Sequence, residues 1–452
     1  MIERSGGSAQ PRTLATSSGA RSRRRRYAVV AAGASAALVL SACGGGDEGS
    51  GAPVLTWYIN NALQAPIGEK CTEQAGGAYE ISIQLLPNNA SGQREQMLRR
   101  LAASDDGVDI ISIDPPFLSE LANAEFLRPF TEEERAEFSE GVLRGPLEQS
   151  LFNDTMFAAP FYGNSQLLWY KKSVAEEAGL DMSQPVTWDQ IIEAAKQTGT
   201  TVAVQGRRNE SLMVWVNALV QSAGGSILTE GEAAETAEDV ESQLDSEAGQ
   251  EAARIMNTIA ESEVAPPALS TAGEEESRAA FQAEDGGFMV NWPYVWAAFT
   301  AGMEDGSLPE DFTDDVAWTR YPQVVEGEES ATPLGGISLG IGAFSQEPDL
   351  AVEAIRCLRS VESQKEYMLT AGDPGASDAL YDDPDVKKQF PMSEDIREGL
   401  EDAGPRPITP FYGDVTAAIQ EGYHPPDALD EETTPEETAS LIEAVLSNEQ
   451  LL

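Results

Sequence analysis

The sequence predicts an α/β fold that begins with an open parallel sheet. Three apolar stretches have the pattern of buried strands, and two amphipathic stretches between them have the pattern of helices. The predicted strands cover 54–59, 79–86 and 108–113, and the predicted helices cover 67–74 and 92–103. Alternation of strand and helix is typical of parallel sheets, because a helix carries the chain back across the sheet before the next strand.

Each of these elements has its own signal. The segment 79–86 alternates apolar and polar residues, as a half-buried strand does. Three apolar side chains share one face of the helix predicted at 92–103. The stretch 108–113 is almost wholly apolar, which indicates a strand buried on both faces, and a turn that begins at Asp114 ends it.

The second half of the sequence continues with the same kinds of element in a less regular order. A strand is predicted at 162–170, and a helix at 274–282 leads to another strand at 287–292. A run of small and apolar residues predicts a further strand at 334–341. The remaining helical segments are predicted at 188–195, at 213–223, within the acidic stretch 230–260 and in a C-terminal block that begins at Asp349.

Polar side chains follow two of the first three predicted strands. Asn60 and Asn61 come directly after the first strand, and Asp114 follows the third. Ligands of open α/β sheets bind beyond the carboxyl ends of the strands. We therefore expect these three residues to lie at a ligand site.

The N-terminus carries the parts of a secretory signal. A basic segment, Arg21–Arg26, precedes thirteen small or apolar residues, Ala28–Leu40, which are too few to span a bilayer as a helix. The stretch ends in Leu40-Ser41-Ala42-Cys43, which resembles the lipobox of bacterial lipoproteins. In a lipobox the Cys takes a diacylglycerol and becomes the N-terminus after cleavage.

This resemblance implies a lipoprotein signal peptide at 1–42 and a lipid on Cys43. The Gly-rich segment 43–51 is predicted to be a flexible tether between the lipid and the folded protein. Two alternatives are a plain signal peptide with a chance Cys and a twin-arginine signal, to which the Arg run is a loose match.

The chain is strongly acidic, with a formal net charge of −47 at pH 7. This charge excludes nucleic acid as an expected partner, because phosphate binding requires Lys and Arg that displace counterions. The overall field also disfavours a strongly anionic ligand, but it disfavours neither a neutral nor a cationic one.

Histidine and cysteine restrict the chemistry further. The single histidine, His424, has neither a nucleophilic nor a metal-binding motif around it, so we expect a loop residue and predict no catalytic residue, metal or cofactor. Apart from Cys43, two cysteines remain, Cys71 and Cys357. An isolated even pair in an exported protein usually forms a disulfide.

Several motifs occur in one order along the chain. Besides the lipobox, the first strand and Asp114, they are Gly163–Tyr170, Val290–Pro293, Leu334–Gly336 and Ala354–Leu358. Their order and spacing resemble the extracellular solute-binding proteins of ABC sugar importers, the maltose-binding-protein-like family 1. Within that family, the Cys pair and the segment Gly404–Pro410 resemble the trehalose-binding lipoproteins of actinobacteria.

The resemblance implies a two-lobed periplasmic-binding-protein fold of type II, the Venus flytrap, with a hinge between the lobes. Lobe one is expected to comprise 52–160 and 315–345. Lobe two is expected to comprise 161–314 and 346–452. Proteins of this kind close on their ligand by hinge motion.

The resemblance also implies a ligand site. Carboxylates, amides and Arg bind sugar hydroxyls in pairs, and a flat aromatic ring covers the apolar face of a pyranose. The positions that match the family's ligand contacts are Asp114, Asn164, Glu274 and Arg406, with Trp292 and the adjacent Tyr294 as the platform and Asn60, Asn61 and Gly336 lining the cleft from lobe one.

Most of these positions also have a purely structural interpretation. Asp114 can be a turn residue, and Asn164 can cap a strand end. Glu274 opens an acidic run at a helix N-terminus, where any carboxylate is favourable. Trp292 can be a core side chain and Arg406 a surface residue, although a strand exit after Trp292 and the prolines around Arg406 favour the cleft.

The sequence therefore predicts a non-enzymatic substrate-binding lipoprotein of an ABC importer for a di- or oligosaccharide, with a trehalose-like sugar favoured. We expect a monomer, lipid-anchored at the extracytoplasmic face of the cell membrane, whose partners are the sugar and the transmembrane permease subunits. One alternative is a glycoside hydrolase that uses two carboxylates such as Asp114 and Glu274. Another is a binding protein for a peptide or polyamine, in whose site Arg406 would be out of place.

Overall fold

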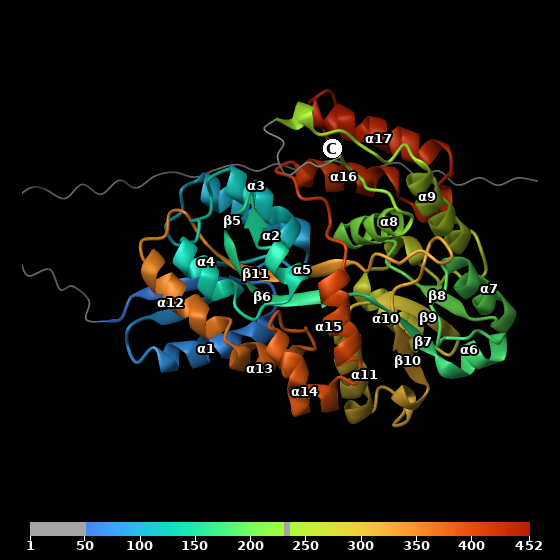
Figure 1. Ribbon diagram of the computed structural model, residues 1–452, viewed down its shortest axis with the longest axis horizontal. Helices are drawn as coiled ribbons and strands as arrows, with labels where there is room; N and C mark the ends of the chain where they lie inside the picture. The colour runs from blue at the N-terminus through green and yellow to red at the C-terminus, as the bar shows by residue number, and fades with distance from the viewer. Residues whose placement is uncertain (1–50, 230–235) are drawn as a thin grey trace, which may run out of the picture. The chain divides into compact units, whose positions relative to one another are not determined.

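Two larger β-sheets, each covered by helices, organise the part of the chain that the structure describes (Figure 1). The computed structural model describes residues 51–229 and 236–452. The predicted signal peptide at 1–42, Cys43 and nearly all of the tether at 43–51 lie outside these residues. We call the five-stranded sheet and its helices the first lobe, and the four-stranded sheet and its helices the second lobe.

The first sheet has the strand order β2-β1-β3-β11-β6. Its strands are β1 (Val54–Ile59), β2 (Glu80–Leu85), β3 (Ile110–Ile113), β6 (Ala158–Ser165) and β11 (Leu334–Ile341). Strand β1 pairs in parallel with β2 and β3, whereas β11 runs antiparallel to β3 and β6. The predicted parallel arrangement of the first three strands is confirmed, and so is the late strand at 334–341.

The second sheet has the strand order β10-β7-β9-β8. Its strands are β7 (Leu167–Lys171), β8 (Thr201–Ala203), β9 (Gly286–Asn291) and β10 (Val316–Thr319). Strand β7 runs antiparallel to β9 and β10, and β8 runs parallel to β9. A separate two-stranded sheet joins β4 (Leu151–Phe152) to β5 (Thr155–Met156).

The single strand predicted at 162–170 is wrong, because two strands occupy this segment. Strand β6 ends at Ser165 and β7 begins at Leu167, and the two belong to different sheets. Gln166, only 2 % exposed, lies between them, so the chain crosses from one lobe to the other inside the protein. Both strands are largely buried and only one residue separates them, so the sequence does not reveal the crossing.

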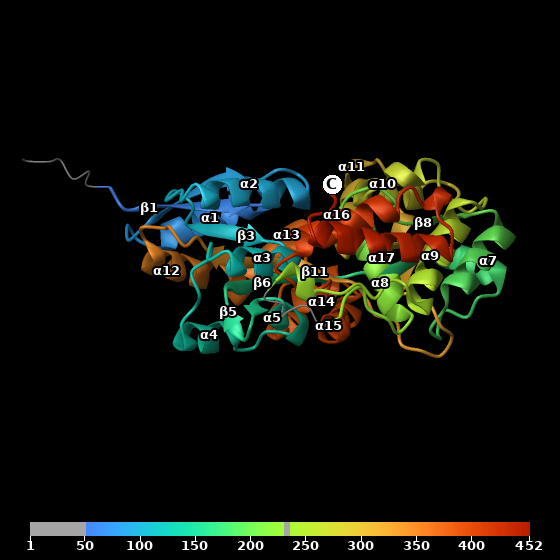
Figure 2. The same cartoon turned by 90° about the horizontal axis from the view of Figure 1, so that it is seen from above.

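Helices pack on both sheets, and the second view separates those of the first lobe from those of the second (Figure 2). They are α1 (Ala65–Gln74), α2 (Ala90–Ala102), α3 (Leu118–Asn123), α4 (Glu132–Ser139), α5 (Arg144–Glu148), α6 (Lys172–Ala178), α7 (Trp188–Thr198), α8 (Glu210–Ser222), α9 (Glu247–Ala260), α10 (Glu274–Gln282), α11 (Tyr294–Asp305), α12 (Pro348–Leu358), α13 (Val361–Ala371), α14 (Pro384–Gln389), α15 (Ser393–Asp402), α16 (Tyr412–Gly422) and α17 (Thr433–Leu446). Each of the helices predicted in separate segments is therefore present; α10 has the predicted ends, and the others have shifted ends.

Two segments pack differently from the predicted lobe boundaries. The range 315–345, expected in lobe one, contains β10, which pairs with β7 in the second sheet. Helices α12 and α13, inside the range expected for lobe two, contribute Ile355 and Tyr367 to the hydrophobic core of the first lobe. A short apolar element carries no local signal for which of two cores it joins, so its partners decide its place.

A disulfide joins Cys71 of α1 to Cys357 of α12. The two residues are 286 positions apart, and their Cα atoms lie 5.8 Å from each other. Cys71 is fully buried in the core of the first lobe. The bond therefore ties the first helix of the chain to a helix that enters the same lobe much later.

The double variant Cys71→Ser/Cys357→Ser is expected to be less stable by about 2–5 kcal/mol, because the disulfide restricts a long loop in the unfolded chain. Denaturant unfolding of the oxidised protein and of the variant measures this difference. Reduction of the wild-type protein should lower its stability to that of the variant. Two free thiols in the native protein on alkylation would contradict the pairing.

Candidate functional site

A cleft of about 760 Å³ lies between the first and second lobes. Most of the predicted site residues line it, namely Asn60, Asn61, Asp114, Asn164, Glu274, Trp292, Gly336 and Arg406. Tyr294 does not line this cleft. It is the first residue of α11, and its hydroxyl donates a hydrogen bond to Glu275 Oε1 at 2.6 Å.

The first-lobe wall is built from the carboxyl ends of strands, as the sequence predicts. Asn60 and Asn61 follow β1, and Asp114 follows β3. Asn60 is held at both ends of its amide: Nδ2 donates to the Tyr162 hydroxyl at 3.0 Å, and Oδ1 accepts from Gln64 Nε2 at 2.8 Å. The Asn61 side chain accepts from the backbone N–H of Leu63 and so caps the following turn.

Arg406 stands at the centre of the charged part of the cleft. Its Nη2 donates to Asp114 Oδ1 at 2.6 Å, and its Nη1 donates to Glu210 Oε1 at 2.7 Å. Asp114 follows β3 of the first lobe, whereas Glu210 begins α8 of the second lobe. The guanidinium therefore bridges the two lobes, with its side chain only 5 % exposed.

Glu210 is a cleft residue that the sequence analysis did not identify. Besides Arg406, the Tyr412 hydroxyl and Thr416 Oγ1 donate to its carboxylate. Burial raises the pKa of Glu210, and the charge of Arg406 opposes this rise. Burial also disfavours the charged form of Arg406, but Asp114, Tyr412 and Glu210 outweigh it and raise the pKa of the guanidinium.

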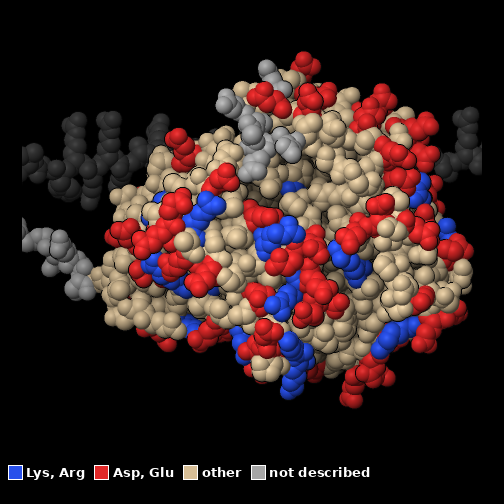
Figure 3. All heavy atoms as spheres, viewed as in Figure 1, with Lys and Arg blue, Asp and Glu red and all other residues tan. Residues whose placement is uncertain are grey.

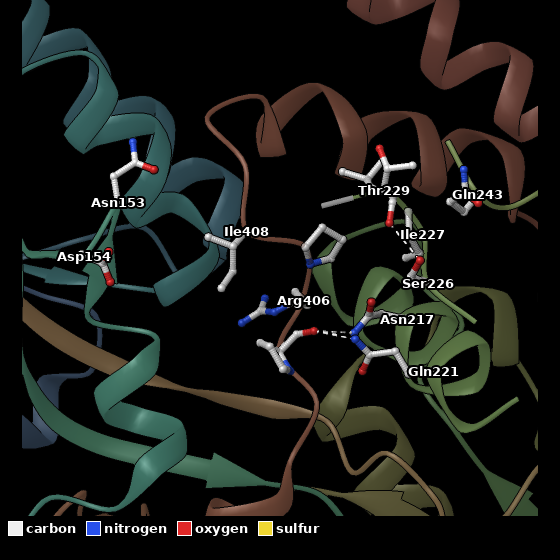
Figure 4. Close-up of a pocket in the computed structure, with 13 residues that line it drawn as sticks. Asn153, Asp154, Asn217, Gln221, Ser226, Ile227, Thr229, Gln243, Arg406 and Ile408 are labelled. Atoms are coloured by element: carbon white, nitrogen blue, oxygen red, sulfur yellow. Dashed lines mark hydrogen bonds between the residues drawn. The ribbon is translucent and has the colours of Figure 1, made fainter. Parts of the chain in front are cut away.

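The segment that carries Arg406 is fixed from both sides. Gly404 pairs with the 332–334 segment, donating to Thr332 O and accepting from Leu334 N. Asn217 Nδ2 and Gln221 Nε2 of α8 both donate to Pro405 O, at 3.2 and 2.8 Å (Figure 4). A second cavity of about 750 Å³ borders this segment.

Trp292 forms the aromatic face of the cleft. It follows β9 directly, and its backbone N–H donates to Asn291 Oδ1 at 2.8 Å. The ring lies against Gly335 of β11 so closely that a Cβ there would come within 3.0 Å of the indole. Because Gly335 has no side chain, an aromatic ring of the second lobe can lie on the backbone of the first.

Gly336, next to Gly335, adopts a backbone conformation that favours glycine, with φ at +133°. A Cβ at this position would lie 2.3 Å from Tyr162 O. The two adjacent glycines therefore allow β11 to lie close to both β6 and Trp292.

The acidic run at the start of α10 has three different sets of partners. Glu274 Oε1 accepts from Ser211 Oγ at 2.7 Å, whereas Glu276 pairs with Arg207 at 2.7 Å. Glu275 accepts from Tyr294 and from Arg278. All three carboxylates line the cleft, so the acidic run belongs to the site and not to an unrelated surface.

These contacts decide what the cleft can bind. Each of its five carboxylates already accepts hydrogen bonds from protein side chains, and four of them pair with an Arg, so no concentrated negative charge remains for a polyvalent cation. Within the described residues, no group of three or more His, Cys, Asp and Glu could hold a metal ion. Acidic and basic groups are interspersed over the visible face of the protein (Figure 3). The cleft suits a neutral ligand with many hydroxyl groups.

The sequence contains signals for some of the cleft residues that were missed. Asn88 and Asn89 come after β2, and they line the cleft just as Asn60 and Asn61 do after β1. The rule that located Asn60 and Asp114 therefore applies to them as well. Glu210 has no such signal, because it begins a helix and its partners lie 196 or more positions away.

Comparisons with known proteins give one family. The sequence model of "Bacterial extracellular solute-binding protein" matches residues 56–365. The maltose-bound structure of T. maritima MalE3 is 26 % identical, with a TM-score of 0.75 over 88 % of this chain and 100 % of that one. A ribitol-bound solute-binding protein of Agrobacterium radiobacter K84, 17 % identical, has a TM-score of 0.72 over 87 % of this chain and 98 % of its own, and so shows the fold alone.

A curated relative is similar over a shorter region. A probable ABC transporter-binding protein of Deinococcus radiodurans is 27 % identical over 264 residues, which are 56 % of this chain and 59 % of the relative. The chain thus matches a little over half the length of this relative. The structural matches confirm the two-lobed α/β fold that the sequence predicts.

Replacing Glu210 with Ala is expected to lower the free energy of unfolding by about 2–4 kcal/mol, because it removes one of two carboxylates that neutralise a buried guanidinium. Thermal and denaturant unfolding measure the loss. The matched control is Glu421→Ala, which removes an exposed partner of Arg208 and should cost less than about 1 kcal/mol. Equal effects of the two variants would contradict the structural role of Glu210.

Proposed function

The chain belongs to the family of bacterial extracellular solute-binding proteins, and we propose that it is the binding component of an ABC importer for a neutral di- or oligosaccharide. The observation that carries this proposal is the combination of Trp292 with the Asp114–Arg406–Glu210 network in one cleft. An aromatic face binds the apolar side of a pyranose, and charged hydrogen-bonding groups bind its hydroxyls.

The geometry favours a sugar over the two alternatives. A retaining or inverting hydrolase needs one carboxyl that is free to donate a proton, yet Asp114 is paired with Arg406 and Glu274 accepts from Ser211. A polyamine would meet the guanidinium of Arg406 at the centre of the cleft. A neutral polyhydroxyl ligand can use both the donors of Arg406 and the free acceptor positions of the carboxylates.

A trehalose-like disaccharide is the favoured ligand. Support comes from the resemblance of Gly404–Pro410 to the trehalose-binding lipoproteins and from the placement of Arg406 in the cleft. The structurally similar T. maritima protein holds maltose, which is also a disaccharide. The volume of the cleft, about 760 Å³, lies within the range of sites that hold ligands of this size.

Binding is coupled to closure of the two lobes. Asn60 and Asp114 reach the ligand from the first lobe, whereas Glu274 and Trp292 reach it from the second. Neither lobe alone supplies all the partners, so the ligand binds the closed form more tightly and shifts the population towards it. The closed protein then delivers its sugar to the permease subunits.

The protein acts as a monomer held at the extracytoplasmic face of the membrane by a lipid on Cys43. The lipobox resemblance and the family support this location. A lipid anchor keeps a binding protein close to its permease while the Gly-rich tether leaves it free to rotate.

Calorimetric titration with trehalose, maltose and other disaccharides tests the proposed ligand class. Trp292→Ala is expected to weaken sugar binding by roughly tenfold or more, because the stacking face is lost. The control Trp318→Phe, which changes an aromatic residue that does not line the cleft, should bind normally. Equal binding by the wild-type protein and both variants would contradict the role of Trp292 as the aromatic platform.

Small-angle scattering and product analysis accompany this titration. A sugar that binds should reduce the radius of gyration as the lobes close. Binding of spermidine but of none of the sugars would overturn the proposed ligand class. Accumulation of product sugars would show that the protein is a hydrolase and not a binding protein.

Lipidation of Cys43 predicts that the protein partitions into detergent when Triton X-114 solutions are phase-separated. Cys43→Ser should move it to the aqueous phase or leave the precursor uncleaved, because the acceptor thiol is gone. Mass spectrometry of the N-terminal peptide identifies the acyl chains directly. Identical partitioning of the two proteins would remove the lipid anchor from the proposal.

A further inference from the structure

The side-chain amide of Asn164 has one bonded end and one unbonded end. Its Nδ2 donates to Asp373 Oδ1 at 3.3 Å. Its Oδ1 is buried and accepts no hydrogen bond from any described residue. A buried acceptor without a donor lowers stability by about 1–3 kcal/mol. A ligand donor that bonded to this oxygen would therefore remove a cost that the described chain leaves in place.

Asp373 determines which end of this amide faces it. The carboxylate accepts from Asn164 at Oδ1 and from the Tyr367 hydroxyl at Oδ2, the latter at 2.9 Å. An ionised carboxylate only accepts hydrogen bonds. Rotation of the Asn164 amide by half a turn would place two acceptor oxygens face to face, so the ionised carboxylate holds the NH₂ group towards itself.

Asp373 also lies near the tyrosine pair that holds Asn60, a second side-chain amide of the cleft. Tyr162, which lies 5.4 Å from Tyr367 between ring centroids, accepts the hydrogen bond from Asn60 Nδ2. The negative charge of Asp373 also raises the pKa of both tyrosines, after burial as the main cause. Both hydroxyls therefore stay protonated and remain available as donors.

We propose that Asp373 is a positioning residue for ligand binding, whose ionised carboxylate orients Asn164 so that the unpaired amide oxygen accepts a hydrogen bond from a ligand hydroxyl. Asp373 itself does not line the cleft, so it acts through Asn164. The proposal rests on the proposed function, because it requires a ligand with hydroxyl donors.

A dependence of binding on pH follows from this arrangement. The titratable groups that face Asp373 are Tyr367 of α13 and Tyr162 of β6, and no described cation forms an ion pair with it. Burial raises the pKa of Asp373 to about 6, although the hydrogen bonds from Tyr367 and Asn164 oppose the rise. As pH falls through this value, a proton occupies an oxygen that already faces a donor, and one of the two hydrogen bonds is lost.

The ligand should therefore bind more tightly when Asp373 is ionised. The affinity is at its maximum above the pKa of Asp373 and falls as the pH drops below it. The size of the effect is that of one hydrogen bond to a charged group. Such a bond is worth more than about tenfold in affinity, but about a tenth of Asp373 is still ionised at about pH 5. The loss of affinity between about pH 7.5 and about pH 5 is therefore roughly five- to tenfold.

The first arm of the test measures this profile with the sugar that binds best in calorimetry. Wild-type protein should show the five- to tenfold loss, whereas Asp373→Asn should bind weakly with an affinity that is constant across the range. The matched control is Glu362→Gln, which removes an exposed carboxylate of α13, the helix that precedes Asp373. This variant should keep the wild-type pH profile. A wild-type profile in Asp373→Asn, or no pH dependence in wild type, would overturn the proposal.

The second arm needs no ligand and so separates this proposal from the proposed function. In ¹⁵N-correlated NMR spectra, the side-chain NH₂ resonances of Asn164, assigned by their absence in Asn164→Ala, should titrate with a midpoint near the Asp373 pKa of about 6. The titration should disappear in Asp373→Asn. Resonances that do not move, or that move equally in the variant, would refute the role of Asp373 even if sugars bind. Failure of every sugar to bind, with this titration present, would refute the proposed ligand alone.

Discussion

The guanidinium of Arg406, buried between Asp114 and Glu210, is the interaction around which the cleft is arranged. Removing a cation from water costs several kcal/mol, so its burial requires two carboxylates at hydrogen-bond distance. One carboxylate follows a strand of the first sheet, and the other begins a helix of the second. The relative position of these two elements in the described structure is therefore restricted by a single planar group. Tyr412 and Thr416 fix the carboxylate of Glu210 in turn.

Much of the fold could be predicted from the sequence, because local patterns determine local structure. The parallel strands β1, β2 and β3 were recognisable from apolar runs separated by helices, and Asn60 and Asp114 were recognisable from their place at strand ends. The break at Gln166 was not recognisable, since this single residue separates two largely buried strands that belong to different sheets. Periodicity reports burial, but it does not report which core buries a residue.

The same reason explains which site residues escaped prediction. Trp292 and Arg406 were found through a resemblance, and the structure places both in the cleft beside Asp114. Tyr294 was grouped with Trp292 by its position in the sequence, but a helix begins at Tyr294 and directs its hydroxyl to Glu275. Glu210 depends wholly on contacts with residues far along the chain, and such contacts leave no pattern in the neighbouring sequence.

The order in which the first sheet is assembled has a consequence for the way the chain is made. Strand β11 occupies the fourth place in that sheet, between β3 and β6, yet it is encoded after the whole second sheet. Until it emerges, β3 and β6 each lack a neighbour, and the polypeptide cannot complete its first core while most of it is still being synthesised. Contacts between such distant segments form slowly. A chain built in this order acquires its full stability only when synthesis is nearly finished.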